Sequence, residues 1–186
     1  MVISDSHKSI RKAVAEVYPE AAWQRCQAHF QRNILDITPH KYKEALALDL
    51  RRMFDAESTD DARQVKEAIV TEYGDVAEKA MEVLETGFEE SMTAKCLPLY
   101  LQTKLRTTNI LERLNRELKR RSDVIQVFPN PESVLRLMGA VTIEINNGYT
   151  VGNSIYAEKA FNKLNTDAFP HLRRIALEQL ALIKAA

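Results

Sequence analysis

The sequence contains few residues that interrupt helices, and it lacks a long apolar run. Of its 186 residues only five are glycine and six are proline, whereas 45% are hydrophobic and 28% are charged. This composition favours a helix-rich globular chain with a substantial core over a disordered one. No segment approaches the roughly 18 consecutive apolar residues of a membrane-spanning helix, and the first residues contain no apolar signal segment. We therefore expect a cytoplasmic protein without a membrane partner.

The sequence lacks the motifs of several kinds of enzyme chemistry. The chain has neither the Gly-x-Ser-x-Gly motif of serine hydrolases nor a glycine-rich phosphate-binding loop. Two cysteines, Cys26 and Cys96, cannot form a disulfide framework, so both are expected to be reduced thiols. Cys26 and His29 share one helical face, but a structural zinc ion needs four ligands and a second paired motif is missing. Zinc is therefore not expected, and a packing or hydrogen-bonding role is favoured for this pair.

The apolar pattern predicts two short strands near the amino terminus. They lie at residues 2–3 and 21–26, and they flank a helix that ends before Pro19. The inward face of this helix is predicted to carry Ile10, Val14 and Val17.

A series of amphipathic helices is predicted to follow. The first opens at Cys26 and runs to about Asp36, and the next begins after the break at Thr38-Pro39. Apolar residues then recur three or four positions apart through three helices, the second of which ends at Gly74. The inward-facing residues of these three helices are predicted to be Tyr42, Leu46, Leu50 and Met53; Ala62, Val65, Ile69 and Tyr73; and Val76, Ala80 and Val83.

Residues 87–108 are less regular. Their KCLPLYL segment is compatible with a short strand, a helix start before Pro98 or a packed loop. Farther along, Asn130-Pro131 begins a helix that is predicted to end at the Asn-Asn-Gly of residues 146–148, and a last helix is expected from about Pro170 to Ile183. The inward face of the helix after Pro131 is predicted to carry Val134, Met138, Val141 and Ile145.

The segment from Thr107 to Arg121, TTNILERLNRELKRR, combines a carboxylate with a strongly basic amphipathic helix. Glu112 shares one face with Asn115 and Lys119. Because Asn109 and Glu112 have the spacing of an N-cap and its partner, a capping box on a surface helix is one interpretation. A metal ligand held beside a phosphate backbone is the other. The apolar stripe that would anchor the helix consists of Leu111, Leu114 and Leu118.

Charge is segregated along the chain although the net charge is zero. Residues 104–121 carry a net charge of +5 and residues 1–52 a net charge of +3, whereas residues 57–90 carry −8. Because arginine matches phosphate oxygens bidentately and clustered like charges otherwise repel, we favour phosphate contact for the basic helix. The candidate DNA-binding side chains are Lys104, Arg106, Arg113, Arg116, Lys119, Arg120 and Arg121.

Three blocks of sequence resemble one family in the family's own order. They are VISDSHKSIRKAV, AAWQRCQAHFQRNI, and TTNILERLNRELKRR followed by VFPNPESVLRLMGAV. Over roughly residues 2–150 they resemble the carboxy-terminal half of a Mutator-type insertion-sequence transposase. The resemblance implies DNA transposition by a DDE-type enzyme with a ribonuclease H-like core, which cleaves and joins strands at element ends with Mg²⁺ or Mn²⁺.

The resemblance also implies which residues take part. Asp5 corresponds to the second of the family's three metal-binding acids and Glu112 to the third, so both are candidate catalytic and metal-binding residues. An intact site is expected to hold two ions. The first acid has no counterpart, so the chain is expected to be a truncated fragment that is inactive alone. Candidates for a structural role or for supporting the metal ligands are Cys26, His29, Asn109 and Asn115, of which Cys26 and His29 match a Cys-x-x-His pattern of the family.

The expected architecture is mainly α, with a partial ribonuclease H-like core of one or two short strands. We expect this core at residues 1–36, an inserted helical lobe at 37–103, core helices with the third acid at 104–150, and a carboxy-terminal helical tail at 151–186. DNA is the expected partner, both as element ends and as target, with a homo-oligomer of the intact protein and nucleoid association. A non-catalytic DNA-binding or oligomerising remnant and a helical interaction module stay open as alternatives.

Overall fold

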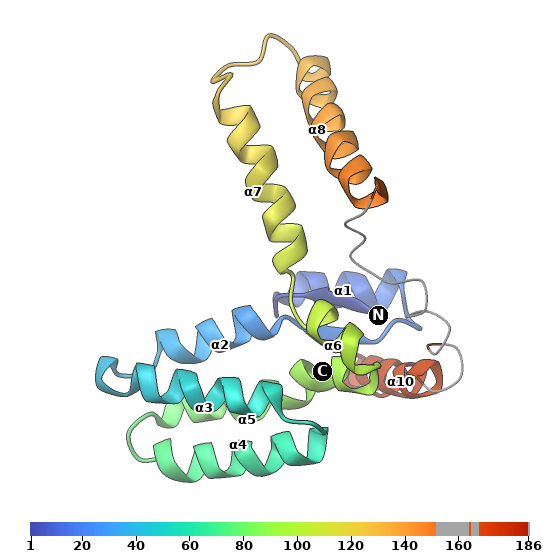
Figure 1. Cartoon of the computed structure of the whole chain (residues 1–186). Helices are drawn as coiled ribbons and strands as arrows, with labels where there is room; N and C mark the ends of the chain where they lie inside the picture. Colours follow the sequence, from blue (N-terminus) through green and yellow to red (C-terminus); the bar gives the residue numbers. More distant parts are fainter. Residues whose placement is uncertain (152–163, 165–167, 186) are drawn as a thin grey trace. The chain divides into compact units, whose positions relative to one another are not determined.

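The computed structural model describes residues 1–151, 164 and 168–185. They belong to two compact units, one formed by residues 1–107 with 160–186 and the other by residues 108–159. Helices predominate in both units, and the strands of the described ranges form a single two-stranded sheet, which confirms the mainly α class (Figure 1). Among the described helices none combines the length and the apolar character that a membrane crossing requires.

A strand–helix–strand segment begins the first unit. β1 (Val2–Ser4) and β2 (Trp23–Arg25) pair in parallel, with Ser4 opposite Arg25, and α1 (Lys8–Val17) connects them. Two parallel strands need such a crossover, because a tight turn reverses the chain direction and can join only antiparallel strands. Both predicted strands are therefore confirmed, and their carboxyl ends meet at one edge of the sheet.

The predicted inward face of α1 is wrong for two of its three residues. Val14 is buried, but the side chains of Ile10 and Val17 are 40% and 64% exposed. A two-stranded sheet offers a narrow surface to the helix, so only the central apolar position of α1 is covered.

Four helices pack side by side to form the main core of the first unit (Figure 1). They are α2 (Gln27–Asp36), α3 (Lys43–Asp55), α4 (Thr59–Tyr73) and α5 (Glu78–Met92), and a 3₁₀ turn, η1 (His40–Tyr42), joins α2 to α3. Their core includes the predicted residues Leu46, Leu50, Met53, Ala62, Ile69, Tyr73 and Ala80, together with Phe30, Ile34, Phe54, Met81, Leu84 and Phe88.

The helix predicted around Val76 is displaced along the sequence. Val76 precedes α5 and is 38% exposed, and the buried face of α5 begins with Ala80 and Met81. Ser58 caps α4 through its hydroxyl, which accepts a hydrogen bond from the Asp61 amide at 3.0 Å. The prediction of Val76 is wrong because the chain after Gly74 continues as a turn before the helix starts at Glu78.

Gly87 lies inside α5 because a side chain there would collide with its neighbours. A Cβ atom at this position would stand 2.2 Å from Arg25 Nη1 and 2.6 Å from the Phe30 ring. The Arg25 guanidinium stacks on that ring, 4.2 Å from its centroid, and burial lowers the Arg25 pKa, an effect that the Glu90 carboxylate opposes. Glu90 also pairs with Arg11 at 2.6 Å.

The less regular segment of residues 87–108 contains a 3₁₀ turn and a short α-helix after the end of α5. α5 ends at Met92 and is followed by the 3₁₀ turn η2 (Thr93–Cys96), after which α6 (Leu99–Leu105) begins behind Pro98. The KCLPLYL segment is therefore a helix start and not a strand, but the helix begins after Pro98 and not before it, as the sequence had suggested. The cause is local, since proline fixes a backbone angle that suits the start of a helix and lacks the amide hydrogen that a strand would need.

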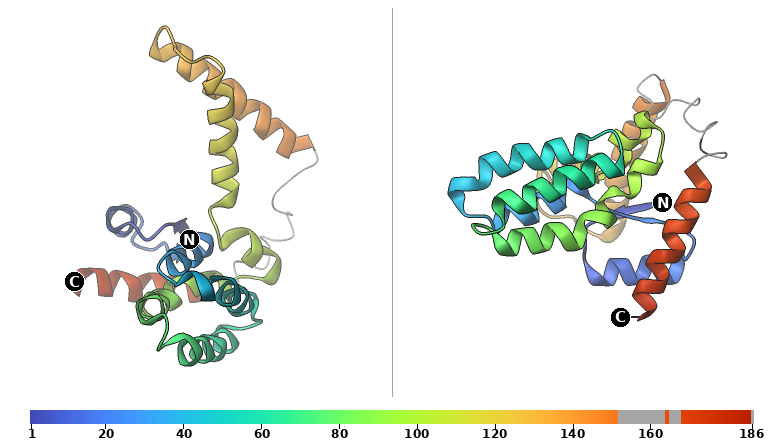
Figure 2. Two further views of the ribbon diagram at one scale, coloured as in Figure 1. Left: turned by 90° about the vertical axis from the view of Figure 1, so that its left-hand side faces the viewer. Right: turned by 90° about the horizontal axis from the view of Figure 1, so that it is seen from below.

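The last helix, α10 (Phe169–Ala185), matches the expected final helix and belongs to the first unit. It lies beside α1, and two views show its path past the sheet (Figure 2). Its apolar residues Leu172 and Ala176 are buried.

The second unit contains a helical hairpin of α7 (Asn109–Asp123) and α8 (Pro131–Val151) (Figure 1). Asn130 caps α8 through its side-chain oxygen, which accepts a hydrogen bond from the Ser133 amide at 2.9 Å, as predicted. The predicted end of α8 at residues 146–148 is wrong, because the helix continues through them to Val151. Among the residues that the structure describes, no atom lies within 4 Å of the Cβ position of Gly148, so a Cβ atom could be added there without a collision.

The apolar stripe of α7 is only partly buried. Leu111 is 55% exposed, whereas Leu114 and Leu118 are half-buried. Among the described residues of this hairpin Val141 alone is fully buried. The hairpin therefore presents much of its surface, including its cations, to solvent or to a partner.

Candidate functional site

Asp5 leaves the sheet at its carboxyl edge, where parallel strands usually present ligand-binding groups. The Trp23 indole donates to Ser4 Oγ at 2.8 Å, and Ser4 Oγ donates to the Asp5 carbonyl oxygen at 2.8 Å. The His7 amide donates to Asp5 Oδ1 at 3.3 Å. These bonds position both the backbone and one carboxylate oxygen of Asp5, whose side chain is exposed.

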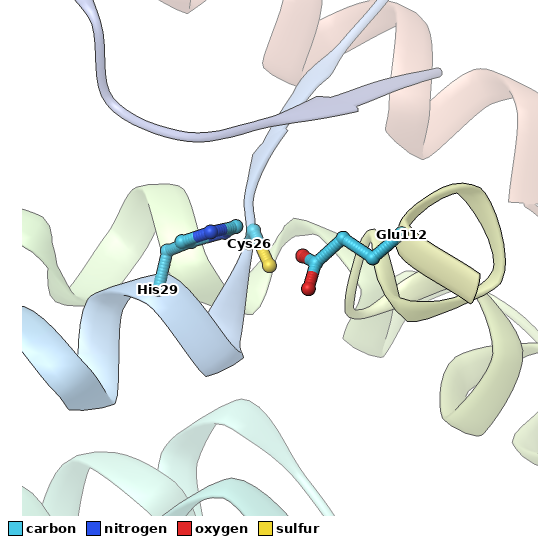
Figure 3. A group of neighbouring side chains, drawn as sticks. All are labelled: Cys26, His29 and Glu112. Atoms are coloured by element: carbon cyan, nitrogen blue, oxygen red, sulfur yellow. The ribbon is translucent and has the colours of Figure 1, made fainter. Parts of the chain in front are cut away.

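Cys26 and His29 come from the amino-terminal end of α2 in the first unit (Figure 3). Cys26 occupies the N-cap position, is fully buried and donates its amide hydrogen to the Ser4 carbonyl oxygen at 2.7 Å. His29 is half-buried, one helical turn farther on. The sheet edge therefore fixes the backbone at Cys26, and the helix fixes the direction of His29.

Glu112 lies on the first turn of α7 in the second unit (Figure 3). The N-cap residue is Thr108, and Asn109 is the first helical residue, so the prediction of Asn109 as the N-cap is wrong by one position. Thr108 Oγ1 donates to Glu112 Oε1 at 2.7 Å, which holds the carboxylate at the end of the helix where its dipole favours negative charge. Asn109 and Asn115 are both exposed.

The predicted DNA-binding lysines and arginines are divided between the two units. Lys104 and Arg106 belong to the first unit, where Arg106 pairs with Asp55 at 2.6 Å and donates to the Phe54 carbonyl oxygen at 3.4 Å. The other five lie on α7: Arg113, Arg116, Lys119, Arg120 and Arg121.

Glu117 neutralises two of the α7 arginines. It pairs with Arg120 at 2.6 Å and with Arg121 at 3.0 Å, and these hydrogen bonds, the one from Arg120 first, lower the pKa of the Glu117 carboxyl to about 2. Arg121 also reaches Glu144 of α8 at 3.5 Å. Within the described part of the chain, Arg113, Arg116 and Lys119 form no ion pair.

A groove of about 430 Å³ runs between α7 and α8 within the second unit. One wall comes from α7 and contains Arg113, Arg116 and the paired Arg120. The other wall comes from residues of α8 that recur three or four positions apart, which places them on one helical face. These α8 residues are Val141, Glu144, Ile145, Gly148 and Tyr149.

On the α8 side of this groove, Val141 and Ile145 belong to the predicted inward face, whereas the contribution of Gly148 and Tyr149 was not predicted from the sequence. Because Gly148 was interpreted as the end of the helix, Tyr149 was assigned to the following segment. The spacing of Val141, Ile145 and Tyr149, each four residues apart, was the available signal, since it continues the same helical face beyond Gly148.

Comparison with known proteins places this chain among transposases. The family described as "Transposase, Mutator family" matches residues 1–152. The transposase for insertion sequence element ISRM5 of Rhizobium meliloti (strain 1021) is 35% identical over 97% of this chain and 44% of its own length. The IS406 transposase of Burkholderia multivorans is 37% identical over 82% of the chain and 39% of its own length, and the IS256 transposase in transposon Tn4001 of Staphylococcus aureus is 33% identical over 84% and 40%.

The chain thus spans about two fifths of the length of these relatives. The match nevertheless covers β1 with Asp5, α2 with Cys26 and His29, and α7 with Glu112. This extent, together with relatives more than 30% identical to the chain, supports one conclusion: the chain belongs to the Mutator family of transposases.

Proposed function

We propose that this chain forms part of a DNA transposase that cleaves and joins DNA strands at the ends of an insertion sequence with the help of divalent metal ions. Family membership supports this proposal, and the observation that carries it is the placement of Asp5 directly after β1. There the Ser4 and Trp23 hydrogen bonds fix the backbone at Asp5. Reaction with a phosphodiester requires such preorganised carboxylates.

Asp5 and Glu112 are proposed as ligands of the ions because hard Mg²⁺ and Mn²⁺ prefer carboxylate oxygens. When bound, two divalent ions would supply activation of the attacking oxygen and stabilisation of the leaving oxygen. Asp5 would bind through the carboxylate that the His7 amide orients, and Glu112 through the carboxylate that Thr108 holds. Two carboxylates rarely suffice for such a site, so we propose that a third acid from outside these 186 residues completes it.

Cys26 and His29 are proposed to support this region rather than to bind zinc. Cys26 anchors the start of α2 on the sheet edge beside the strand that carries Asp5. A thiolate and an imidazole suit zinc chemically, but a structural zinc site needs four such ligands. Equilibrium dialysis against zinc tests this assignment, since stoichiometric zinc that survives a weak chelator would contradict it.

Reconstitution of DNA cleavage tests the proposed activity. The 186-residue chain alone is expected to leave element-end DNA intact. Addition of the amino-terminal part of a relative that carries an acid-bearing strand, in cis or as a separate polypeptide, is expected to give nicking that depends on Mg²⁺ or Mn²⁺. Asp5→Asn and Glu112→Gln should each abolish it.

Two outcomes would contradict this proposal in different ways. Robust metal-dependent nicking by the chain alone would show that the assignment of three acids is wrong. Failure of the reconstituted protein, with folded components and tight DNA binding, would favour a non-catalytic DNA-binding or oligomerising role. Sedimentation of the reconstituted protein would test the expected homo-oligomer in the same samples.

Metal binding tests the two acids separately from catalysis. Titration of Mn²⁺ monitored by electron paramagnetic resonance should give weaker binding in both Asp5→Asn and Glu112→Gln. Asp123→Asn is the matched control, because Asp123 ends α7 and is exposed. Equal affinities for all four proteins would remove Asp5 and Glu112 from the metal site.

A further inference from the structure

We propose that the groove between α7 and α8 binds the phosphate backbone of one DNA strand through Arg113 and Arg116, and that Arg120 and Arg121 instead brace the hairpin. This inference rests on the proposed function, because it assumes that the chain binds DNA. It goes beyond that function by separating the basic residues of one helix into two roles.

The separation follows from the ion pairs of α7. Glu117 accepts hydrogen bonds from Arg120 at 2.6 Å and 2.9 Å and from Arg121 at 3.0 Å. Arg121 extends this network to Glu144 on the neighbouring helix. A guanidinium already paired in this way gains less from a phosphate, because a new contact must replace an existing charge-assisted bond.

Arg113 and Arg116 have no such competitor. They lie on the exposed part of α7, and neither takes part in an ion pair within the described residues. Both line the groove, one helical turn apart, so their guanidinium groups can follow consecutive phosphates. Their charge is therefore available to a polyanion.

The lining of the groove suits contact with a DNA strand. Its volume is about 430 Å³, and its apolar lining includes Leu114, Val141 and Ile145. Tyr149 adds an aromatic side chain on which a base or sugar can pack. Gly148 leaves space on one wall, since no described atom lies within 4 Å of its Cβ position.

The salt dependence of DNA binding distinguishes direct phosphate contacts from long-range electrostatic attraction. We would measure binding of a fluorescein-labelled mixed-sequence duplex to the full 186-residue chain over a KCl series. Arg113→Gln and Arg116→Gln should each lower the slope of log affinity against log salt by about 0.9, one phosphate contact each. Arg136→Gln is the matched control, because Arg136 is exposed on the same hairpin, lies outside the groove and donates a hydrogen bond to the Ser133 hydroxyl. The slope of log affinity against log salt for Arg136→Gln should equal that of the unmodified chain.

A pair of substitutions at Gly148 tests whether the strand enters the groove. Gly148→Glu places a carboxylate on the groove wall and should weaken DNA binding severalfold, whereas Gly148→Ala should leave it unchanged. Both variants are expected to fold, because a Cβ atom at Gly148 meets no described atom within 4 Å. Circular dichroism of each variant would confirm the helical content.

The outcomes are distinguishable. If the unmodified chain shows no salt-dependent DNA binding, the proposed function fails. If the chain binds DNA but Arg136→Gln loses as much slope as Arg113→Gln, or Gly148→Glu binds as well as Gly148→Ala, the proposed function stands and the groove proposal fails. A salt-sensitive dimer that Arg113→Gln dissociates, with DNA affinity unchanged, would assign the groove to the acidic surface of a second copy and would also overturn the proposal.

Discussion

The side-chain amide of Gln179 pairs with both backbone groups of Trp23. The Trp23 amide donates to Gln179 Oε1 at 2.8 Å, and Gln179 Nε2 donates to the Trp23 carbonyl oxygen at 2.9 Å. This arrangement imitates the two hydrogen bonds that a further strand would make with β2. α10 therefore closes the sheet edge with a side chain in place of a strand, which protects the edge from pairing with other chains.

Replacing Gln179 should destabilise the first unit. Gln179→Ala removes both hydrogen bonds to Trp23 and is expected to lower the free energy of unfolding by about 1–3 kcal/mol, measured by urea denaturation. Gln179→Glu should also destabilise, because a carboxylate cannot donate to the Trp23 carbonyl oxygen. Glu178→Ala is the control, since Glu178 is exposed on the same helix and its change should be small. Equal stabilities of the Gln179→Ala and Glu178→Ala variants would contradict the role of this contact.

Adding one methyl group at Gly87 should be costly. The new Cβ atom would overlap Arg25 and Phe30, so we expect Gly87→Ala to lower the free energy of unfolding by roughly 1–3 kcal/mol. Gly139→Ala on α8 provides a contrast, because its Cβ position is open and alanine favours the helix by about 0.5–1 kcal/mol. A double-mutant cycle with Arg25→Lys should show non-additivity, since the two positions are in contact. Additive effects would mean that the cost of Gly87→Ala does not come from its contact with Arg25.

Tyr73 should make stability depend on alkaline pH. Its hydroxyl donates to Asp49 Oδ2 at 2.9 Å, and burial, followed by this hydrogen bond, raises the Tyr73 pKa to about 12. Because the folded pKa lies above the ordinary value near 10, the contribution of the bond is complete below pH 10 and is lost as the pH rises toward 12. Tyr73→Phe should therefore cost about 1–3 kcal/mol at pH 8 and less at pH 11, by denaturation at both values. The same cost at both pH values would contradict this linkage.

Glu117 should titrate far below an ordinary glutamate. Its pKa of about 2 compares with the usual 4.5, so the pairs with Arg120 and Arg121 are fully formed above pH 4.5 and are lost only as the pH falls toward 2. Carbon-13 nuclear magnetic resonance of the side-chain carboxyl should report this midpoint. Arg120→Gln should move it upward, whereas Arg113→Gln should not. A midpoint near 4.5 in the unmodified chain would mean that the pairs of Glu117 with Arg120 and Arg121 do not form in solution.

The sequence by itself determined the class and most of the local structure. Apolar spacing predicted both strands and the helices through residues 26–73, because helical periodicity and N-caps such as Ser58 depend on residues a few positions apart. The resemblance of its blocks to Mutator-type transposases was sufficient to identify the family, which the comparisons confirmed. Asp5 and Glu112 stay predictions as metal ligands.

Only the tertiary structure decided how distant residues meet. Gln179 and Trp23 are 156 residues apart, and no local pattern links them. Gly87 begins the segment that is less regular in the sequence, yet it lies inside α5, where the Arg25 side chain occupies the space beside it. The pairs of Glu117 with Arg120 and Arg121 lie within one helix, whereas the pair of Arg121 with Glu144 joins two helices and therefore depends on how the hairpin packs. Periodicity records which face a residue occupies, but the neighbour on that face is chosen by how the whole chain packs.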